Sequence, residues 1–402
     1  MSEWKLKDCC LSISDGDHLP PPKAESGIPF ITISNIDATN HIDFGNTLFV
    51  PIDYYNKLDS IRKARPNDII YSVVGSFGKP VLIKDNRKFV FQRHIAILRP
   101  NSEVVDSRFL YYVMLSRDFY MQADSVAIGA AQRTISLTSL RNMKVELPSL
   151  ANQIHIANIL SRYDSLIENY QKQIKLLEEA AQRLYKEWFV DLRFPGHENT
   201  IIVDGVPEGW EKKPALDFFE MSIGKTPPRA QKQWFTKGSN GIPWVSISDM
   251  KETMFVQETA EELTQDACEN YNIKVVPKGT ILLSFKLTVG RVAFAGADVC
   301  TNEAIAHFQK EGDEWKAYTL MYLRNYNYDS LGNTSGISKA VNSTIIKNMP
   351  FVMPCTAILQ EFSQRVLPFI KQTENLQSQI RLLTEARDRL LPKLMSGEIK
   401  VS

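Results

Sequence analysis

The sequence predicts an α+β protein, in which two pseudo-repeated mixed α/β modules are separated by two long helices that form an antiparallel coiled coil. Three observations carry this prediction. The segment ENYQKQIKLLEEAAQRL at residues 168–184 returns as ENLQSQIRLLTEARDRL at residues 374–390, which is 206 residues later and about half of the 402-residue chain. Both copies consist of good helix formers and carry an apolar heptad pattern. Short β-rich runs precede each copy.

The apolar positions of both helices follow alternating steps of three and four residues, which leave a narrow stripe typical of a coiled-coil seam. The predicted seam of the first helix is Leu160, Tyr163, Ile167, Tyr170, Ile174, Leu177, Ala181, Leu184 and Trp188, and that of the second is Val366, Phe369, Thr373, Leu376, Ile380, Leu383, Arg387, Leu390 and Leu394. Thr373 and Arg387 interrupt the second stripe, so the pairing should be imperfect. The alternative, two ordinary amphipathic core helices, does not explain a repeat at half the chain length.

The repeat extends beyond the helices and sets the expected domain boundaries. Trp4 and Trp210 lie 206 residues apart, whereas Gly27 and Gly241 lie 214 apart, so the second copy holds eight extra residues between these landmarks. The expected order is a first module at 1–150, a central long helix at 151–190, a linker at 191–206, a second module at 207–354, and a C-terminal long helix with a tail at 355–402.

Each module should mix short strands with one short helix. The clearest strands of the first module are FITIS, DIIYSVV, PVLI and KFVFQRHIAIL, with a helix at 108–122. Those of the second are PWVSIS, TILLSF, RVAFAG and AIAHFQ, with WKAYTLMYLRNY as its helix. The first long helix should run from about Asn152 to Phe189, and the second should end near Met395. Pro368 lies where the second should be starting, and predicts a kink or a delayed start there.

Composition excludes several classes of protein. The formal charge is only +1, so a nucleic-acid surface would have to be a local patch. The five cysteines form no C-x-x-C pair and are odd in number, which argues for reduced thiols and against a disulfide framework or structural zinc. The N-terminus has no apolar signal core and no run approaches transmembrane length, so we expect a cytoplasmic protein without a membrane partner.

No catalytic signature emerges from the sequence. Gly224-Lys225-Thr226 resembles the end of a phosphate-binding loop, but Phe219 stands where that loop needs a glycine. No Gly-x-Gly-x-x-Gly follows a strand, and no tetrapeptide typical of amino-methyltransferases is present. The six histidines lack metal-ligand spacing. We therefore expect no catalytic or metal-binding residues, and a protein that recognises rather than converts its target.

Basic and polar residues at equivalent loop positions are the candidates for DNA contact. They are Lys23, Lys79, Gln132, Arg133, Arg229, Lys286, Ser338 and Lys339. Arginine and lysine can donate hydrogen bonds to the edge of guanine, and glutamine can form paired hydrogen bonds with adenine. Either cation can also bind phosphate. The alternative is that each is a solvated surface residue. The recurrence of similar chemistry in both modules favours the functional interpretation for the set.

The order of these motifs resembles that of the specificity subunits of type I restriction–modification systems. The matching stretches are DGDHLPPPK with GIPFITISNID, SIGKTPPR with GIPWVSISDM, RPNDIIYSVVGS, LPSLANQIHIANIL, LYKEWFVDLRFP and LLPKLMSGEI. The family's Glu-Gln pair at the start of each long helix is replaced here by Asn152-Gln153 and Leu359-Gln360. The resemblance covers essentially the whole chain.

The resemblance implies a non-catalytic DNA reader. Each module would be a target recognition domain for one half of a bipartite, asymmetric site. The seam would hold the domains apart and dock two copies of a DNA adenine methyltransferase subunit, and restriction subunits could join them. S-adenosylmethionine, ATP and magnesium would then belong to partner subunits, with no cofactor in this chain. We also expect a partner to cover Tyr163, Tyr185, Trp188 and Phe189, which two helices alone would leave exposed.

Two other functions stay open at this point. The chain could be a stand-alone or exchangeable DNA-recognition or scaffold protein without a cognate nuclease. It could also be a methyltransferase or nuclease with unrecognised motifs. A sequence-preferring, salt-dependent DNA interaction would distinguish a reader from a pure scaffold.

Overall fold

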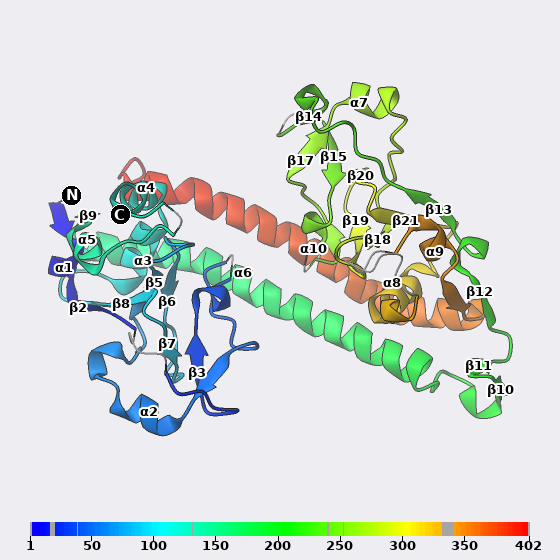
Figure 1. Ribbon diagram of the computed structural model, residues 1–402, viewed down its shortest axis with the longest axis horizontal. Coiled ribbons are helices and arrows are strands. Elements are labelled where there is room, and N and C mark those ends of the chain that lie inside the picture. Colours follow the sequence, from blue (N-terminus) through cyan, green and yellow to red (C-terminus); the bar gives the residue numbers. More distant parts are fainter. Residues whose placement is uncertain are drawn as a thin grey trace. The chain divides into compact units, whose positions relative to one another are not determined.

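The computed structural model describes residues 2–16, 21–37, 39–130, 132–238, 241–251, 253–331 and 341–400. The chain forms two compact units (Figure 1). Unit 1 comprises Met1–Ile167 with Leu383–Ser402, and unit 2 comprises Glu168–Leu382. Each long helix therefore contributes to both units. The finer domain boundaries stay predictions.

Both long helices are present. Helix α6 spans Leu150–Tyr185 and continues into the π-helical turn η3, Lys186–Val190. Helix α10 spans Thr356–Met395. The expected delayed start at Pro368 is wrong, because α10 is already helical from Thr356. Phe362, Val366 and Ile370 are buried on either side of this proline, so tertiary packing outweighs the lost backbone hydrogen bond.

The described residues of unit 1 form three small sheets. Its central sheet has the antiparallel order β2-β8-β5-β6, its second sheet the order β4-β3-β7, and β1 pairs with β9. The strands are β1 Ser2–Lys5, β2 Cys10–Asp15, β3 Ile28–Ile31, β4 Leu48–Val50, β5 Ile69–Ser72, β6 Pro80–Leu82, β7 Val90–Phe91, β8 Ile95–Pro100 and β9 Lys144–Leu147. The helices preceding α6 are α1 Leu6–Cys9, α2 Ile52–Lys57, α3 Ser107–Leu115, α4 Arg117–Val126 and α5 Leu137–Asn142.

Two of the helices in unit 1 replace the single helix expected at 108–122. The chain leaves helical geometry at Ser116, where φ is −65° and ψ is 150°. The Ser116 hydroxyl accepts a hydrogen bond of 3.2 Å from the backbone N–H of Phe119 and so caps α4. The apolar pattern runs through this break, because both helices cover the same core, to which Phe109 and Phe119 contribute.

Unit 2 repeats the plan with additions. The order β13-β21-β18-β19-β16 matches the central sheet of unit 1 and adds β16, while β14-β17-β15-β20 adds β14 to the second sheet. The strands are β10 Ile202–Val203, β11 Val206–Pro207, β12 Glu211–Pro214, β13 Glu220–Ile223, β14 Phe235–Thr236, β15 Ile242–Val245, β16 Phe255–Val256, β17 Glu261–Leu263, β18 Ile281–Ser284, β19 Val292–Ala295, β20 Cys300–Thr301, β21 Ile305–Gln309 and β22 Pro350–Met353. β12 pairs with β22, and β10 with β11.

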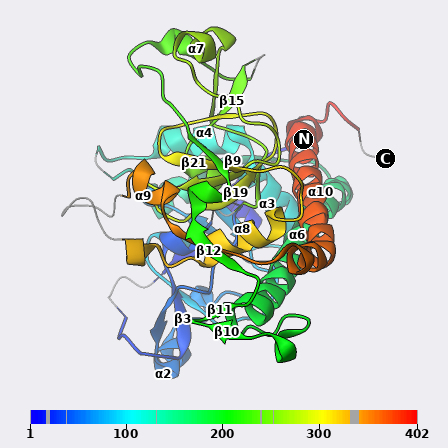
Figure 2. The same cartoon turned by 90° about the vertical axis from the view of Figure 1, so that its right-hand side faces the viewer.

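The helices of unit 2, besides parts of α6 and α10, are α7 Gln265–Asn270, α8 Lys316–Asn325 and α9 Ser343–Lys347. In Figure 1, α7, β14, β15 and β17 extend away from the five-stranded sheet, and in Figure 2 α7 and β15 again lie away from β19 and β21. The other strands predicted in both modules are confirmed in type, but the single strand expected for KFVFQRHIAIL is wrong, because this run forms β7 and β8, which belong to different sheets. The eight extra residues lie in the segment that carries β14.

The predicted seam residues of the long helices are buried or half-buried. Ile167, Trp188 and Leu376 are buried, and the rest of the predicted interface is half-buried: Tyr163, Tyr170, Ile174, Leu177, Leu184, Ile380, Leu383 and Leu390. In unit 1, Leu160 of α6 shares a core with Leu394 of α10. In unit 2, the ring centroid of Trp188 lies 5.7 Å from that of Phe362. Within each unit the two helices are therefore neighbours. One continuous coiled coil stays a prediction.

The two polar interruptions of the seam behave differently. Arg387 donates to Asp164 of α6 at 2.8 Å, and Asp164 also accepts a 2.5 Å hydrogen bond from Tyr112. This interruption is therefore compensated by an ion pair within unit 1. The Thr373 hydroxyl is buried without a hydrogen-bond partner among the described residues, which costs stability. The expected imperfection thus lies at Thr373.

The expectation that the aromatic end of α6 needs a partner to cover it is wrong for two of its members. Tyr185 and Trp188 are each only 4% exposed. They belong to the core of unit 2, where the Phe189 ring centroid lies 4.6 Å from that of Tyr318. The sequence pattern could not show this, because the covering residues come from the globular module.

A buried histidine distinguishes the core of unit 2. His307 is fully buried in β21, with Nδ1 2.8 Å from the Ser222 hydroxyl and Nε2 2.8 Å from the Thr301 hydroxyl. Burial lowers the pKa of His307 to about 4, with a smaller contribution from the charge of Lys274. The imidazole is therefore neutral in the folded protein at neutral pH.

We predict that burial of His307 makes the free energy of unfolding decrease as the pH is lowered from about 6.5 to about 4. The unfolded chain takes up a proton at the ordinary histidine pKa of about 6.5, whereas the folded chain does so only near 4. The contribution is complete above about 6.5 and is lost as pH falls towards 4, by about 3 kcal/mol. The urea midpoint of His307→Asn should vary less over this window. The exposed control His155→Asn should follow the wild type, and equal slopes for all three proteins would refute this role.

Candidate nucleic-acid interface

In each unit, the loops at the ends of several strands meet at one end of the central sheet. We call this the loop edge. In unit 1 it comprises residues 32–35, 73–79 and 91–94 with Gly16, Gln132 and Arg133, and in unit 2 residues 224–229, 246–249, 285–291 and 301–304. The same backbone hydrogen bonds hold both. Val73 N–H donates to His94 C=O at 2.9 Å, as Phe285 N–H does to Ala304 C=O at 2.9 Å.

A glycine allows the first loop to approach the sheet. Gly16 donates its N–H to Ile95 C=O, and Gly224 donates to Ile305 C=O, each at 3.2 Å. A Cβ on Gly16 would lie 2.1 Å from Phe91 C=O oxygen, and one on Gly224 would lie 2.0 Å from Thr301 Oγ1. Both contacts are far shorter than van der Waals distance. The two positions therefore require glycine for the same steric reason.

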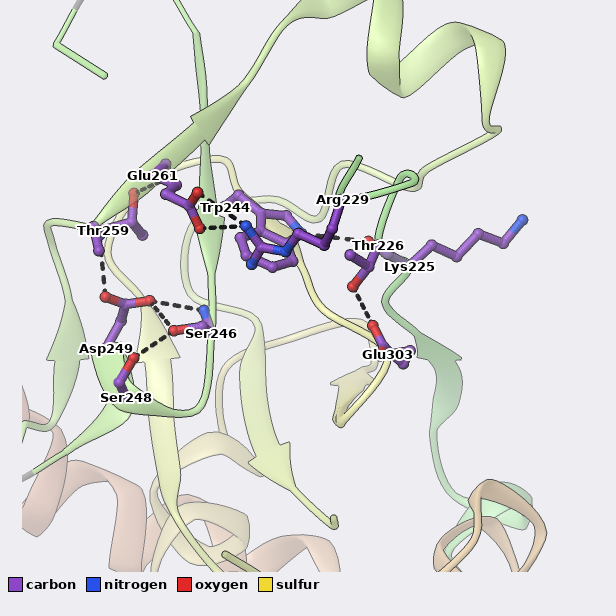
Figure 3. Close-up of polar contacts among 11 residues, drawn as sticks. Lys225, Thr226, Arg229, Trp244, Ser246, Ser248, Asp249, Thr259, Glu261 and Glu303 are labelled. Atoms are coloured by element: carbon purple, nitrogen blue, oxygen red, sulfur yellow. Dashed lines mark hydrogen bonds and ion pairs between the residues drawn. The ribbon is translucent and has the colours of Figure 1, made fainter. Parts of the chain in front are cut away.

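A polar turn follows the β3 and β15 strands and has the same geometry in both units. In unit 2, the Ser246 hydroxyl lies 2.7 Å from that of Ser248 and donates to Asp249 at 2.6 Å, and Asp249 also accepts from Ser246 N–H at 2.8 Å (Figure 3). In unit 1 the Thr32 hydroxyl lies 2.7 Å from that of Ser34 and donates to Asn35 Oδ1 at 2.8 Å. Asn35 Oδ1 also accepts from Thr32 N–H at 2.9 Å. Ser34 and Ser248 are exposed.

The hairpin turns of the central sheets also correspond. Ser72 accepts from Lys79 N–H at 2.9 Å, and Ser284 accepts from Arg291 N–H at 3.0 Å. Gly78 and Gly290 both have φ of 92°. Lys79 thus corresponds to Arg291, whereas Lys286 lies near the start of its turn.

The cations at the ends of these turns support the polar turns. Lys79 Nζ donates to Ile36 C=O at 3.3 Å, and Arg291 donates to Ile247 C=O at 2.7 Å. Both side chains are half-buried, and each donates a hydrogen bond to a backbone carbonyl. Their first role is to fix the loop edge.

Arg229 is held by several groups (Figure 3). Its guanidinium donates to both carboxylate oxygens of Glu261, at 2.9 and 2.7 Å. It also lies 4.5 Å from the ring centroids of both Phe235 and Trp244. Both hydrogen bonds come from Nη1, so the guanidinium is held by this ion pair and by the two aromatic rings. The equivalent strand position in unit 1 is Leu48, so Lys23 has no matching carboxylate and is exposed.

Arg133 is likewise engaged, while Gln132 is exposed. Arg133 forms an ion pair with Asp124 and lies 5.4 Å from the Phe77 ring centroid. The Phe77 ring stacks on that of Tyr120 with centroids 5.9 Å apart. The backbone N–H of Gly75 donates to Arg133 C=O at 2.9 Å, which joins this loop to the hairpin turn. The structure thus brings Gln132, Arg133 and Lys79 into one loop edge.

Lys286 is at the loop edge of unit 2, half-buried and without an ion pair in the described part of the chain. Ser338 and Lys339 lie outside the described residues. Sequence reasoning missed Lys225, Arg93 and Glu303. Lys225 is exposed and extends away from the carboxylates (Figure 3). The signal that could have found them is the register of the two copies, which only the strand pairing reveals.

Glu303 is an exposed carboxylate surrounded by cations. It accepts a hydrogen bond from Thr226 (Figure 3). Burial by itself would raise the pKa of Glu303, but the Thr226 hydrogen bond and the charges of Lys286 and Arg229 together lower it below its ordinary value. The side chain is therefore an ionised acceptor at neutral pH.

A groove of about 920 Å³ also occurs in unit 1. Tyr112, Lys144, Arg387 and Met395 are among its lining residues, and none of the lining residues belongs to the loop edge. Within the described ranges, no group of three or more His, Cys, Asp or Glu side chains is placed to hold a metal ion. None of the helices in the described part of the chain is long and apolar enough to cross a membrane.

We predict that Gly224→Ala disrupts the loop edge of unit 2. Overpacking should cost on the order of 1–3 kcal/mol, because the Cβ contacts backbone that cannot move independently of the sheet. Thermal unfolding measures this cost. Gly205→Ala is a control for adding a methyl group, since Gly205 has open space around its Cβ position, although its φ of 75° carries its own strain. A Gly224→Ala protein as stable as the wild type would show that the close approach is not maintained.

The comparisons with known proteins agree with this architecture. A sequence profile of the family described as "Type I restriction modification DNA specificity domain" matches residues 3–179 and 207–384. The specificity subunit of the type I restriction enzyme HindI from Haemophilus influenzae is 24% identical, over 99% of this chain and 100% of that protein. The MjaIX specificity subunit from Methanocaldococcus jannaschii is 28% identical, over 75% of this chain and 71% of that protein.

A solved structure shares the fold. The S subunit of a type I restriction–modification system from M. genitalium aligns with a TM-score of 0.60 at 15% identity, covering 98% of this chain and 95% of that one. The family profile matches each half of the chain separately. This agrees with the presence of one loop edge in each half. The chain belongs to the family of type I restriction–modification DNA specificity subunits.

Proposed function

We propose that this chain is the non-catalytic, sequence-specific DNA-binding subunit of a type I restriction–modification complex, and that it reads a bipartite, asymmetric target. The observation that carries the proposal is the pair of loop edges. They share one backbone framework but carry different exposed side chains. A shared framework suits the common shape of DNA, and different side chains suit two different half-sites.

The exposed side chains of the loop edges have the chemistry for DNA contact. Gln132, Lys225 and Lys286 belong to the loop edges and are exposed or half-buried, and Lys23, which lies outside the defined loop edge, is also exposed; the three lysines form no ion pair with any described residue. Lysine suits phosphate, and glutamine suits the adenine edge. Lys79, Arg133 and Arg229 are engaged within the protein. We propose that these three shape the interface, and that DNA is contacted first by the unengaged side chains.

The long helices are the proposed docking surface for the modification subunits. Leu176 and Leu382 are 64% and 55% exposed, and Leu166 is 42% exposed. Exposed apolar side chains on two helices that are neighbours within each unit suit further helices from a partner. We propose that two DNA adenine methyltransferase subunits dock there, and that restriction subunits can join. S-adenosylmethionine, ATP and magnesium would be bound by those partners.

A module exchange tests the proposal directly. Residues 1–150 are replaced by the first module of another specificity subunit, and the chimera is co-expressed with the cognate methyltransferase. One half of the methylated motif should change, while the other half and the gap stay constant, since each loop edge is built within one unit. Long-read sequencing of modified adenines measures this. A replacement of residues 207–354 should change the opposite half.

A motif in which both halves change after one exchange would contradict the assignment of one half-site to each module. A complex that methylates no preferred sequence would contradict the proposed function as a whole.

A further inference from the structure

Two structurally equivalent positions carry opposite charges at the loop edges. Gln92 N–H donates to Ile31 C=O at 3.1 Å, and Asn302 N–H donates to Val245 C=O at 3.0 Å. Two residues further along the chain, the carbonyls of His94 and Ala304 accept the matching bonds from the hairpin turns. The residue between them is Arg93 in unit 1 and Glu303 in unit 2. Both are exposed.

The neighbouring positions show which parts of the loop edge are constant. The glycine pair 16 and 224, the polar turns and the hairpin cations keep their chemistry in both units. By contrast, Gly75 corresponds to Leu287, which is 82% exposed with φ of 60°. The charge reversal at Arg93 and Glu303 is therefore a difference placed on a constant framework.

From this juxtaposition we infer that Arg93 and Glu303 are specificity-determining residues, with Arg93 contacting a guanine and Glu303 contacting the amino group of a cytosine. Arginine presents paired donors that match the O6 and N7 acceptors of guanine, and a carboxylate accepts from cytosine N4. The inference rests on the proposed function and assigns base classes to its two half-sites.

The surroundings of each side chain support this assignment. Arg93 forms no ion pair with any described residue, so its guanidinium fork is available. Glu303 would be repelled by phosphates if it stood alone. Lys286 and Arg229 compensate this charge, and the hydrogen bond from Thr226 fixes the carboxylate. An ionised carboxylate at the loop edge can accept a hydrogen bond from the amino group of a base.

The test uses the chain in complex with its methyltransferase subunit and selects duplexes randomised across both half-sites. Arg93→Ala should relax discrimination at one G·C pair of one half-site, and Glu303→Ala at one pair of the other, by roughly 5- to 100-fold each. Arg93→Glu and Glu303→Arg should exchange the preferred guanine and cytosine at those pairs. The rest of each half-site and the gap should stay unchanged.

Matched controls lie at the opposite ends of the strands. Arg87→Ala and Glu311→Ala remove exposed charges of the same type there and should leave the motif unchanged. Thermal midpoints equal to that of the wild type would show that the folds are intact.

Three results would overturn the inference while leaving the proposed function standing. They are an unchanged motif in both alanine variants, a uniform loss of affinity at all base pairs with a smaller salt dependence, and charge exchanges that change no base preference. A wild-type complex without any preferred sequence would instead refute the proposed function itself.

Discussion

The close approach of one glycine backbone to the end of the central sheet is the constraint on which each loop edge depends. At Gly16 and Gly224 there is no room for a Cβ, and the N–H of each glycine binds the first residue of the next strand, Ile95 or Ile305. This contact anchors the first loop. The hairpin turn and the polar turn then bind to the same strand ends, so that several loops become one surface.

The charged side chains of that surface fall into two groups, those bound within the protein and those that stay free to contact DNA. Arg229 and Arg133 are neutralised by Glu261 and Asp124 and lie over aromatic rings. Arg291 binds a backbone carbonyl. These cations stiffen the loops, although Arg229 and Arg291 each donate within the protein through Nη1 alone. The net charge of +1 gives the chain as a whole little attraction for DNA, so DNA affinity depends on local groups of exposed side chains.

Much of the fold could be predicted from the sequence, because the two periodicities are local signals and the repeat can be read directly from the sequence. The long helices, the positions of most strands along the chain and the number of modules follow from them. The break at Ser116 and the continuity through Pro368 did not follow. In the first case a side-chain cap competes with the helix, and in the second, packing outweighs a missing donor. The covering of Trp188 also depends on residues far away in the sequence.

The candidate site was harder to predict for a geometric reason. The offset between the copies is 214 residues at Gly27 and Gly241 but 206 at Asn142 and Asn348, so no single offset aligns the loops. An offset close to 206 pairs Lys79 with Lys286, whereas the hairpin geometry pairs Lys79 with Arg291. Charge alone also could not separate Lys23, which is exposed, from Arg229, which is bound by Glu261. That distinction depends on one cross-strand position, occupied by Leu48 in one copy and Glu261 in the other.

The measurement that tests the central claim most directly is the adenine methylome written by this chain with its methyltransferase partner. If two equivalent loop edges each read their own half-site, the methylated motif consists of two short, different sequences separated by a fixed gap of unspecified bases. A continuous or palindromic motif would contradict the account.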